Sequence, residues 1–359
     1  MTKEGKSSSI SMVNSQDDKW LNWQGNGKMP HVVLVSGDEE YRSEEALPQL
    51  AKILSIRHGF KCTVLFAQDP NLQGIINPNY SHHIPGLELL ETADMMILFT
   101  RFRALPDTQM KHIDNFLKSG KPILGMRTAT HAFHYAKTES NYNHYDNYHE
   151  SEDGWNGGFG RLVLGEHWIS HHGKHGHQST KGLIAIEGRG HPILNSIKDG
   201  DIWAASDVYG VRLPLPPSCQ TLVLGQVTDR EGAYDEKDAR LGMRPSDYKK
   251  PKTTIQKDNQ DNEYEMNQND PMMPVAWIKN YQLPGGKSGK CFNTTIGASV
   301  DLLAEGTRRM LINGVFWCLD LEVPEKANVE IVDTFEPTPF AFHKDEYWKA
   351  KKMRVAAMK

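Results

Sequence analysis

The architecture of this chain is indicated most clearly by the stretch KPILGMRTATHAF, residues 121–133. Residues 122–125 form a short apolar run that predicts a buried strand, and the following residues predict a tight turn leading into a helix. In doubly wound α/β proteins, such a turn displays a key side chain at the carboxyl end of the sheet. Arg127 and Thr128 lie at the turn, and His131 lies on the predicted helix. The stretch therefore predicts a fold class and also the sheet edge at which a site would form.

Strands and helices are expected to alternate along the first part of the chain. The predicted strands before this stretch are residues 31–37, 62–66 and 95–99, and the predicted helices are residues 43–56, 87–91 and 106–119. Later strands are predicted at residues 182–186, 202–205, 221–227, 275–277 and 290–295, before a closing helix at 301–319. This alternation indicates an α/β protein with a mainly parallel sheet and helices on both faces.

The chain is expected to contain one large domain, residues 31–325, between a polar N-terminal arm, residues 1–30, and a C-terminal tail, residues 326–359. Within the domain, residues 134–180 lack apolar periodicity, which is typical of a functional or mobile loop. Residues 229–270 are charged and rich in Asn, Gln and Lys. They predict a solvated polar insertion that buries little surface.

The composition argues against several classes of partner. With a net charge of −4, the 359-residue chain lacks the basic balance expected for nucleic-acid binding. The sequence has no run of 18 apolar residues and no basic amphipathic stretch, so we expect no membrane partner. The first 30 residues contain no apolar signal core, which predicts a cytoplasmic protein, or a periplasmic one if an export signal preceded this sequence. A homo-oligomer is an open alternative.

A family resemblance is carried by short segments that lie in order along residues 31–340. They are GDEEYRSEE (37–45), TRFR (100–103), GMRTATHAF (125–133), HHG (171–173), HPIL (191–194), SDVY (206–209), PVAW (274–277), TTIG (294–297) and PTPF (337–340). In these segments the chain resembles the ThuA-like (trehalose-utilisation) family of the class I glutamine amidotransferase-like superfamily. The resemblance implies a flavodoxin-like sheet and a role in sugar metabolism. Ala298 stands where many members have a histidine, so no role of that histidine carries over.

The resemblance also defines what this chain lacks. Glutamine amidotransferase-type proteins carry a Gly-x-Cys-x-Gly elbow, whereas here Arg127 occupies the cysteine position and Ala129 the second glycine position. Thiol-dependent amide hydrolysis is therefore not expected. A residual amidase would instead need Thr128 as its nucleophile and His131 as the base. The four scattered cysteines predict buried free thiols and no disulfide framework: Cys62, Cys219, Cys291 and Cys318.

Polar side chains follow three of the predicted parallel strands. Glu40 and Tyr41 follow the first strand, Arg101 follows the third, and Arg127 and Thr128 follow the fourth. Because the carboxyl ends of parallel strands share one edge of the sheet, we expect these side chains to bind a sugar, whose hydroxyls need both donors and acceptors. The structural alternative is that the acidic residues after the first strand cap the first helix and pair with Arg101.

Five of the 16 histidines lie within residues 167–177. Imidazole is the commonest metal ligand, and alternating His and Gly residues give a loop that is flexible enough to wrap an ion. We therefore expect a divalent metal such as Zn at His171 and His172, which the resemblance covers, whereas His175 and His177 fall outside it. His172 is also a candidate for sugar binding. The alternatives are a solvated polar loop, or imidazoles that bind only sugar.

Asp207 and Tyr209 follow the predicted strand at residues 202–205. Together with His131 they form the expected catalytic set, because a carboxylate or imidazole base and a phenol acid can move protons on a sugar carbon next to a carbonyl. The alternative is that Asp207 is a capping residue and Tyr209 a core residue.

The function expected from these residues and from the resemblance is that of a carbohydrate-catabolism enzyme acting on a disaccharide or keto-glycoside. Its reaction would be isomerisation or elimination/hydrolysis by acid/base chemistry, with or without a metal, and without a cysteine nucleophile. Its partner would be a small-molecule sugar. The alternative is a non-catalytic sugar-binding or scaffold protein that kept the fold.

Overall fold

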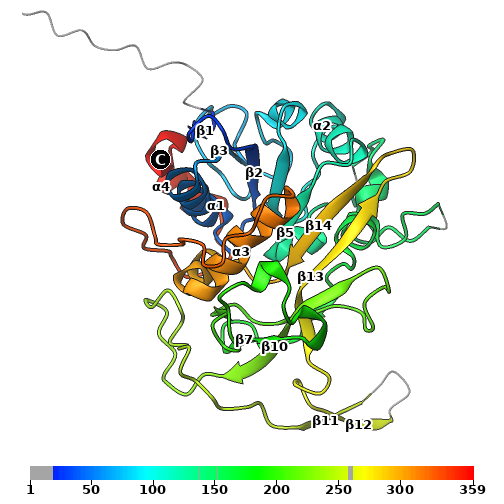
Figure 1. Cartoon of the computed structure of the whole chain (residues 1–359), viewed down its shortest axis with the longest axis vertical. Coiled ribbons are helices and arrows are strands. Elements are labelled where there is room, and N and C mark those ends of the chain that lie inside the picture. Colours follow the sequence, from blue (N-terminus) through cyan, green and yellow to red (C-terminus); the bar gives the residue numbers. More distant parts are fainter. Residues whose placement is uncertain (1–18, 137, 152, 258–261) are drawn as a thin grey trace, which may run out of the picture.

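The computed structural model describes residues 19–359 except 137, 152 and 258–261. Within these residues the main sheet has ten strands. Their order across the sheet is β1 (Leu21–Trp23), β3 (Lys61–Phe66), β2 (His31–Gly37), β4 (Met95–Thr100), β5 (Ile123–Met126), β14 (Ser288–Thr294), β13 (Met273–Gln282), β10 (Gln220–Asp229), β7 (Gln178–Ile184) and β8 (Trp203–Ala204). Figure 1 shows this sheet running through the molecule between its helices. Every helix in the described part of the chain is too short or too polar to cross a lipid bilayer.

The sheet is mixed, so the expectation of a mainly parallel sheet was wrong. The strands β3, β2, β4, β5 and β14 are parallel, whereas β1 and the four strands beyond β14 pair antiparallel. A parallel pair needs a long crossover connection, but residues 283–287 between β13 and β14 allow only a hairpin. The parallel strands have the order of flavodoxin-like sheets, yet the large mixed sheet is only loosely consistent with that class.

Helices cover both faces of the parallel strands. The helices α1 (Ser43–Lys52) and α3 (Glu305–Cys318) pack on one face, and α2 (Asp107–Lys118) packs on the other. Successive residues of β2 alternate between these faces, because side chains along a strand point in opposite directions. Val32 and Leu34 lie in the cluster with α1, and Val33 and Val35 lie in the cluster with α2. Each fully buried valine or leucine stabilises the fold by roughly 1.5–3 kcal/mol.

The predicted turn after β5 is confirmed, but the helix after it is short. Arg127 has a φ of 45°, in the left-handed region, and it begins a 3-10 helix at Arg127–His131. A non-glycine residue in this region costs roughly 1–3 kcal/mol. The turn directs the Arg127 side chain into the interior, where it is fully buried. The structure therefore holds a strained elbow at the position where the superfamily resemblance implied one.

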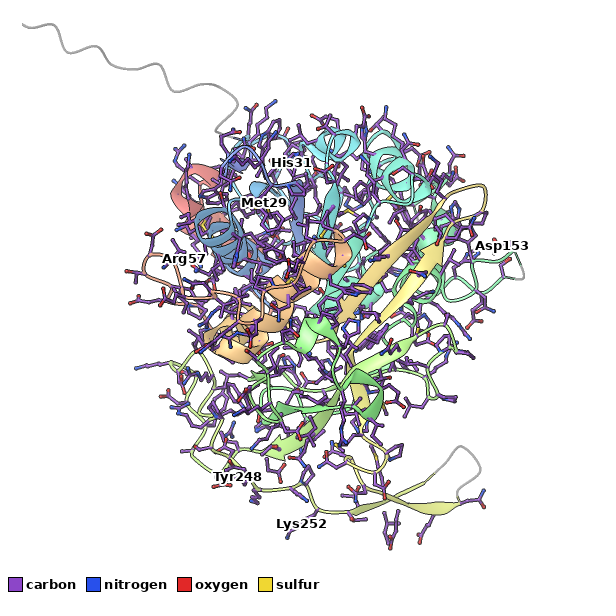
Figure 2. The ribbon with its side chains drawn as sticks, in the orientation of Figure 1. Met29, His31, Arg57, Asp153, Tyr248 and Lys252 are labelled. Atoms are coloured by element: carbon purple, nitrogen blue, oxygen red, sulfur yellow. The ribbon has the colours of Figure 1, made fainter. Side chains whose placement is uncertain are left out.

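The insertion and the C-terminal segment both contribute to the protein interior. Residues 229–270 include the two-stranded sheet of β11 (Thr254–Lys257) and β12 (Glu263–Met266), and Figure 2 shows Tyr248 and Lys252 at the end of the molecule away from Met29 and His31. Members of the main hydrophobic cluster come from both segments: Leu241, Met243, Phe340, Trp348, Met353 and Val355. The chain ends at α4 (Asp345–Lys351) and a final turn, which lie beside α1 (Figure 1).

Candidate functional site

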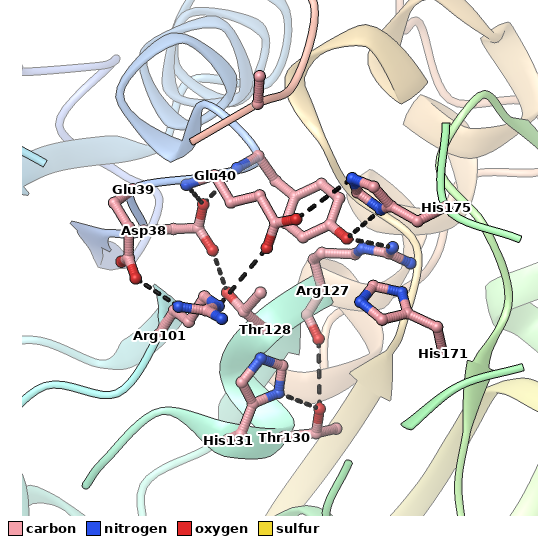
Figure 3. A network of polar contacts seen from close by, with 12 residues as sticks. Asp38, Glu39, Glu40, Arg101, Arg127, Thr128, Thr130, His131, His171 and His175 are labelled. Carbon is pink, nitrogen blue, oxygen red and sulfur yellow. Dashed lines mark hydrogen bonds and ion pairs between the residues drawn. The ribbon is translucent and has the colours of Figure 1, made fainter. Parts of the chain in front are cut away.

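The segments after β2, β4 and β5 converge at one edge of the sheet, as the parallel order requires. Figure 3 shows their polar side chains gathered in one network. Asp38 joins two of these segments: one of its carboxylate oxygens accepts a hydrogen bond from Thr128 Oγ1 at 2.7 Å, and the other accepts from the backbone N–H groups of Glu40 and Tyr41. Asp38 and Thr128 are both fully buried. Thr128 therefore bonds the elbow to the segment after β2, and its expected role in sugar binding stays a prediction.

The acidic residues after β2 pair with arginines after β4. Glu39 accepts hydrogen bonds from Arg101, at 2.5 Å, and from Arg103. Glu40 Oε2 lies 3.5 Å from Nε of Arg101. Arg101 therefore pairs with these acids, as the structural alternative expected. The same alternative expected the acids to cap the first helix, but no side-chain hydrogen bond caps the start of α1. Burial, reinforced by the charge of Asp38, raises the pKa of Glu40 to about 8, so this carboxyl is protonated at neutral pH.

Arg127 occupies the centre of the network, and both of its terminal nitrogens donate hydrogen bonds to protein groups, whereas its buried Nε has no partner. One terminal nitrogen donates to the backbone carbonyls of Asp207 and Thr295, both at 2.7 Å. The other donates to Tyr41 Oη and to Asp207 Oδ1, both at 3.0 Å. The guanidinium also lies 3.6 Å from the ring centre of Tyr209 and 4.3 Å from that of Tyr41. Arg127 is fully buried, so these contacts hold the segments of the site together, and its expected contact with a sugar stays a prediction.

Asp207 connects this buried arginine to two histidines. Its Oδ2 lies 2.7 Å from Nδ1 of His171, and its Oδ1 lies 3.3 Å from Nδ1 of His175. Burial alone would raise the pKa of Asp207, but hydrogen bonds from His171 and His175 and the charge of Arg127 hold that pKa well below its usual range. Asp207 is fully buried, whereas the two histidine side chains are 38% and 36% exposed. The ionised carboxylate of Asp207 therefore orients two imidazole rings that are partly exposed to solvent.

His175 contacts two carboxyl groups of opposite protonation state. Its Nδ1 faces Asp207 and also lies 3.3 Å from Tyr41 Oη, while its Nε2 lies 3.4 Å from Oε1 of Glu40. The imidazole thus joins a protonated carboxyl to an ionised one. Pairs of titratable groups whose surroundings drive their pKa values apart are typical of acid/base sites. His175 was not among the residues expected to act here.

The other two residues of the expected catalytic set are enclosed by aromatic rings. The ring centre of His131 lies 4.9 Å from those of both Phe102 and Trp168, and 5.7 Å from that of Tyr209. Burial and the neighbouring arginines, Arg101 first, hold the pKa of His131 well below its ordinary value, so the ring is neutral. Tyr209 is 1% exposed, and burial raises its pKa. Both side chains are closed to solvent and form an inner wall of the site.

His172 lies apart from the cluster to which it was assigned. Its Nε2 lies 2.7 Å from the backbone carbonyl oxygen of Gln268, in the insertion. His171 belongs to the short strand β6 (Ser170–His171), which pairs with β9 (Tyr209–Gly210). His172 follows β6 at a bend, and its side chain reaches Gln268 while that of His171 faces Asp207. The pairing of His171 with His172 is therefore replaced by that of His171 with His175.

His171, His175 and Asp207 also form a candidate cation site. The donor atoms of His171, His175 and Asp207 all lie within 4.8 Å of one another. Zinc binds imidazole nitrogen and carboxylate oxygen at about 2.0–2.2 Å, so two of its ligand atoms lie at most about 4.4 Å apart. The cluster thus fits a divalent cation after a small contraction of its half-exposed imidazoles. Two neutral imidazoles and one carboxylate are ligands that suit zinc and similar ions.

No protein-family model matches the chain, and no curated protein matches it. Among solved structures, it is similar to a protein from Parabacteroides merdae described as ThuA-like, with 11% identity, a TM-score of 0.47, and coverage of 89% of this chain and 99% of that one. It is also similar to the exo-β-1,4-mannosidase Op5Man5 from Opitutaceae bacterium strain TAV5, with 8% identity, a TM-score of 0.29, and coverage of 81% and 36%. Likenesses at this level assign no activity to this chain.

Proposed function

We propose that the protein is a carbohydrate-catabolism enzyme that acts on a disaccharide or keto-glycoside by acid/base chemistry, without a cysteine nucleophile. One observation carries the proposal: His175 joins a protonated Glu40 to an ionised Asp207, and Asp207 also orients the exposed His171. An acid and a base within one small cluster are what proton transfer on a sugar requires. The substrate class in this proposal is inferred from the ThuA-like resemblance of the sequence.

His171 is the proposed general base. Because its Nδ1 faces the ionised carboxylate of Asp207, that nitrogen carries the ring proton and Nε2 is left to accept one. In a keto-glycoside, Nε2 would take the proton from the carbon next to the carbonyl. The electron pair would form a carbon–carbon double bond as the bond to the glycosidic oxygen on the next carbon breaks. Returning the proton to a neighbouring carbon would give isomerisation instead.

Glu40 is the proposed acid, and His175 covers it. The departing glycosidic oxygen needs a proton, and Glu40 holds one at neutral pH. Glu40 is 2% exposed, and both ring nitrogens of His175 face protein groups. The glycosidic oxygen would therefore take the proton directly from Glu40, after the half-exposed imidazole of His175 turns aside. Arg101, whose side chain is 20% exposed beside Glu40, is the cation placed to stabilise negative charge that develops on the carbonyl oxygen.

The test is a turnover screen with keto-glycosides and their unoxidised parents. We expect His171→Ala to lower kcat by about 10²- to 10⁴-fold. His172→Ala is the matched control, because this neighbour contacts Gln268 and not the cluster. Turnover that survives His171→Ala would refute the assigned base. Ligands that raise the Tm of the wild-type protein without any turnover would favour the non-catalytic sugar-binding alternative.

A metal-assisted form of the same reaction is favoured by the convergence of His171, His175 and Asp207. A divalent cation held there would supply Lewis-acid polarisation of a carbonyl oxygen or an activated water. Asp207 would keep its contact with Arg127 through Oδ1, which leaves Oδ2 as the freer donor. The two forms differ in whether the purified protein binds a stoichiometric cation.

A further inference from the structure

A groove of about 950 Å³ adjoins the candidate site through His175. Its walls come from three separate segments: residues 175–177 of the histidine-rich loop, residues 234–241 of the insertion, and residues 338–347 of the C-terminal segment. His175 thus has one side toward Glu40 and Asp207 and another side in the groove. The groove therefore meets, at His175, the cluster to which acid/base chemistry was assigned.

Exposed aromatic rings line the groove. Tyr234, Phe342 and Tyr347 are 53%, 56% and 38% exposed, although large aromatic side chains are usually much more buried. Tyr234 stacks against His177 with an angle of 28° between the rings, and Tyr347 stacks against His343 with an angle of 16°. These stacked pairs hold the rings in fixed orientations while leaving surface open to the groove.

The boundary between groove and site is also aromatic. Phe340 is 3% exposed, and its ring centre lies 5.2 Å from that of His175 and 5.3 Å from that of Tyr41. Phe342 lies under the guanidinium of Arg101, 4.8 Å away. The C-terminal segment therefore contributes two rings to the groove beside His175: the buried Phe340, which packs against the imidazole, and the exposed Phe342.

The lining combines these rings with polar groups. The side chains of Glu236 and Lys237 are exposed, and both line the groove. A sugar ring presents apolar C–H faces and hydroxyl edges, so it suits aromatic faces bordered by donors and acceptors. Small-molecule sites usually occupy about 300–1,000 Å³. The groove is large enough on this scale for more than one sugar ring.

We propose that this groove binds the further sugar units of an oligosaccharide whose reacting unit lies beside His171 and His175. The inference rests on the proposed function for the identity of the reacting unit. The substrate would be a chain of sugars that continues past His175 over Tyr234 and Phe342. The sugar chain would be bound mainly by stacking on aromatic rings, so the affinity would rise with the number of sugar units.

The test measures binding and does not require turnover. Gluco-oligosaccharides of two to five units, in α- and β-linked series, are titrated into the wild-type protein and into Tyr234→Ala and Phe342→Ala by calorimetry. We expect affinity to rise with chain length, and each variant to reduce that gain by about three- to tenfold, the size of an aromatic contact. Tyr248→Ala is the matched control, because Tyr248 is 71% exposed in the same insertion and lies outside the groove lining.

Affinity that is independent of chain length in both series, or no binding of either series, would overturn the inference. An equal effect of Tyr248→Ala would do the same. Failure of the proposed reaction gives a different result: length-dependent binding that Tyr234→Ala reduces, with no turnover of keto-glycosides. Conversely, turnover lost in His171→Ala together with binding that ignores chain length would leave the reaction standing and refute the groove.

Discussion

The Nδ1 atom of His171 lies 2.7 Å from Oδ2 of Asp207, although 36 residues separate them in the sequence. The contact is set by two strands, because β6 and β9 pair with His171 opposite Tyr209, two residues beyond Asp207. Asp207 in turn meets the guanidinium of Arg127 at the elbow after β5. The exposed imidazole is therefore fixed by a chain of buried contacts that reaches the centre of the sheet.

The first prediction concerns the buried pair of Asp207 and Arg127. Asp207→Asn should lower the free energy of unfolding by about 3–5 kcal/mol, because it leaves the Arg127 charge buried without its ionic partner. Urea unfolding followed by circular dichroism measures the change. The double variant Asp207→Asn/Arg127→Met should recover part of the loss, since it removes both charges. Arg127→Met alone gives the comparison. If the double variant is less stable than Asp207→Asn by as much as Arg127→Met alone destabilises the wild type, the two changes are independent and this account is contradicted.

The second prediction concerns pH and two buried glutamates. Burial raises the pKa of both Glu40 and Glu44 to about 8 from an ordinary value of 4.5. The folded protein therefore keeps protons that the unfolded chain releases near pH 4.5. Their stabilising contribution is complete below that pH and is lost as the pH rises toward 8, by up to about 1.4 kcal/mol per pH unit for each carboxyl.

Glu40→Gln and Glu44→Gln should each flatten this decline in stability between pH 5 and 8, because glutamine does not titrate. Unfolding in urea at several pH values measures it. Glu44 pairs with no site residue, so Glu44→Gln serves as the control for activity, and only Glu40→Gln should reduce turnover. A wild-type protein whose stability rises steadily from pH 5 to 8, and does so equally in both variants, would show that neither carboxyl is protonated in the fold.

The third prediction concerns the cation site. The wild-type protein should bind about one zinc ion per chain, and His171→Ala and His175→Ala should each weaken that binding by at least tenfold, because each removes one of three protein ligands. Calorimetric titration with zinc, after treatment with a chelator, measures the stoichiometry and affinity. His172→Ala should bind zinc as the wild type does. Equal losses in all three variants would place the ion elsewhere in the loop.

The fourth prediction concerns the C-terminal segment. Trp348 is 1% exposed, its indole N–H donates to Asn79, and the Arg42 guanidinium lies 5.0 Å from its ring. Trp348→Ala should therefore lower the free energy of unfolding by about 3–5 kcal/mol, as expected for a large aromatic residue removed from a core. Tyr347→Ala, at the neighbouring and partly exposed position, is the control and should cost much less. Similar small effects in both variants would show that the segment lies on the surface.

The sequence allowed much of the parallel half of the sheet to be predicted. The expected strand at residues 31–37 coincides with β2, and the expected helix at 106–119 differs from α2 by one residue at each end. Apolar runs and amphipathic spacing are local properties, so they survive in the sequence. The antiparallel half was harder, because an apolar run does not reveal which partner its strand pairs with. The pairing of β10 with both β7 and β13 depends on contacts between residues far apart in the chain.

The sequence by itself determined which segments would meet at the edge of the sheet, because the carboxyl ends of parallel strands must lie together. Only the tertiary structure decided which of their side chains face solvent. Arg127 and Thr128 follow a strand as a ligand-binding pair would, yet both are buried. His175 contacts Tyr41 across 134 residues, and His172 contacts Gln268 across 96. The direction of a loop side chain is set by such distant partners, and local sequence patterns contain no record of them.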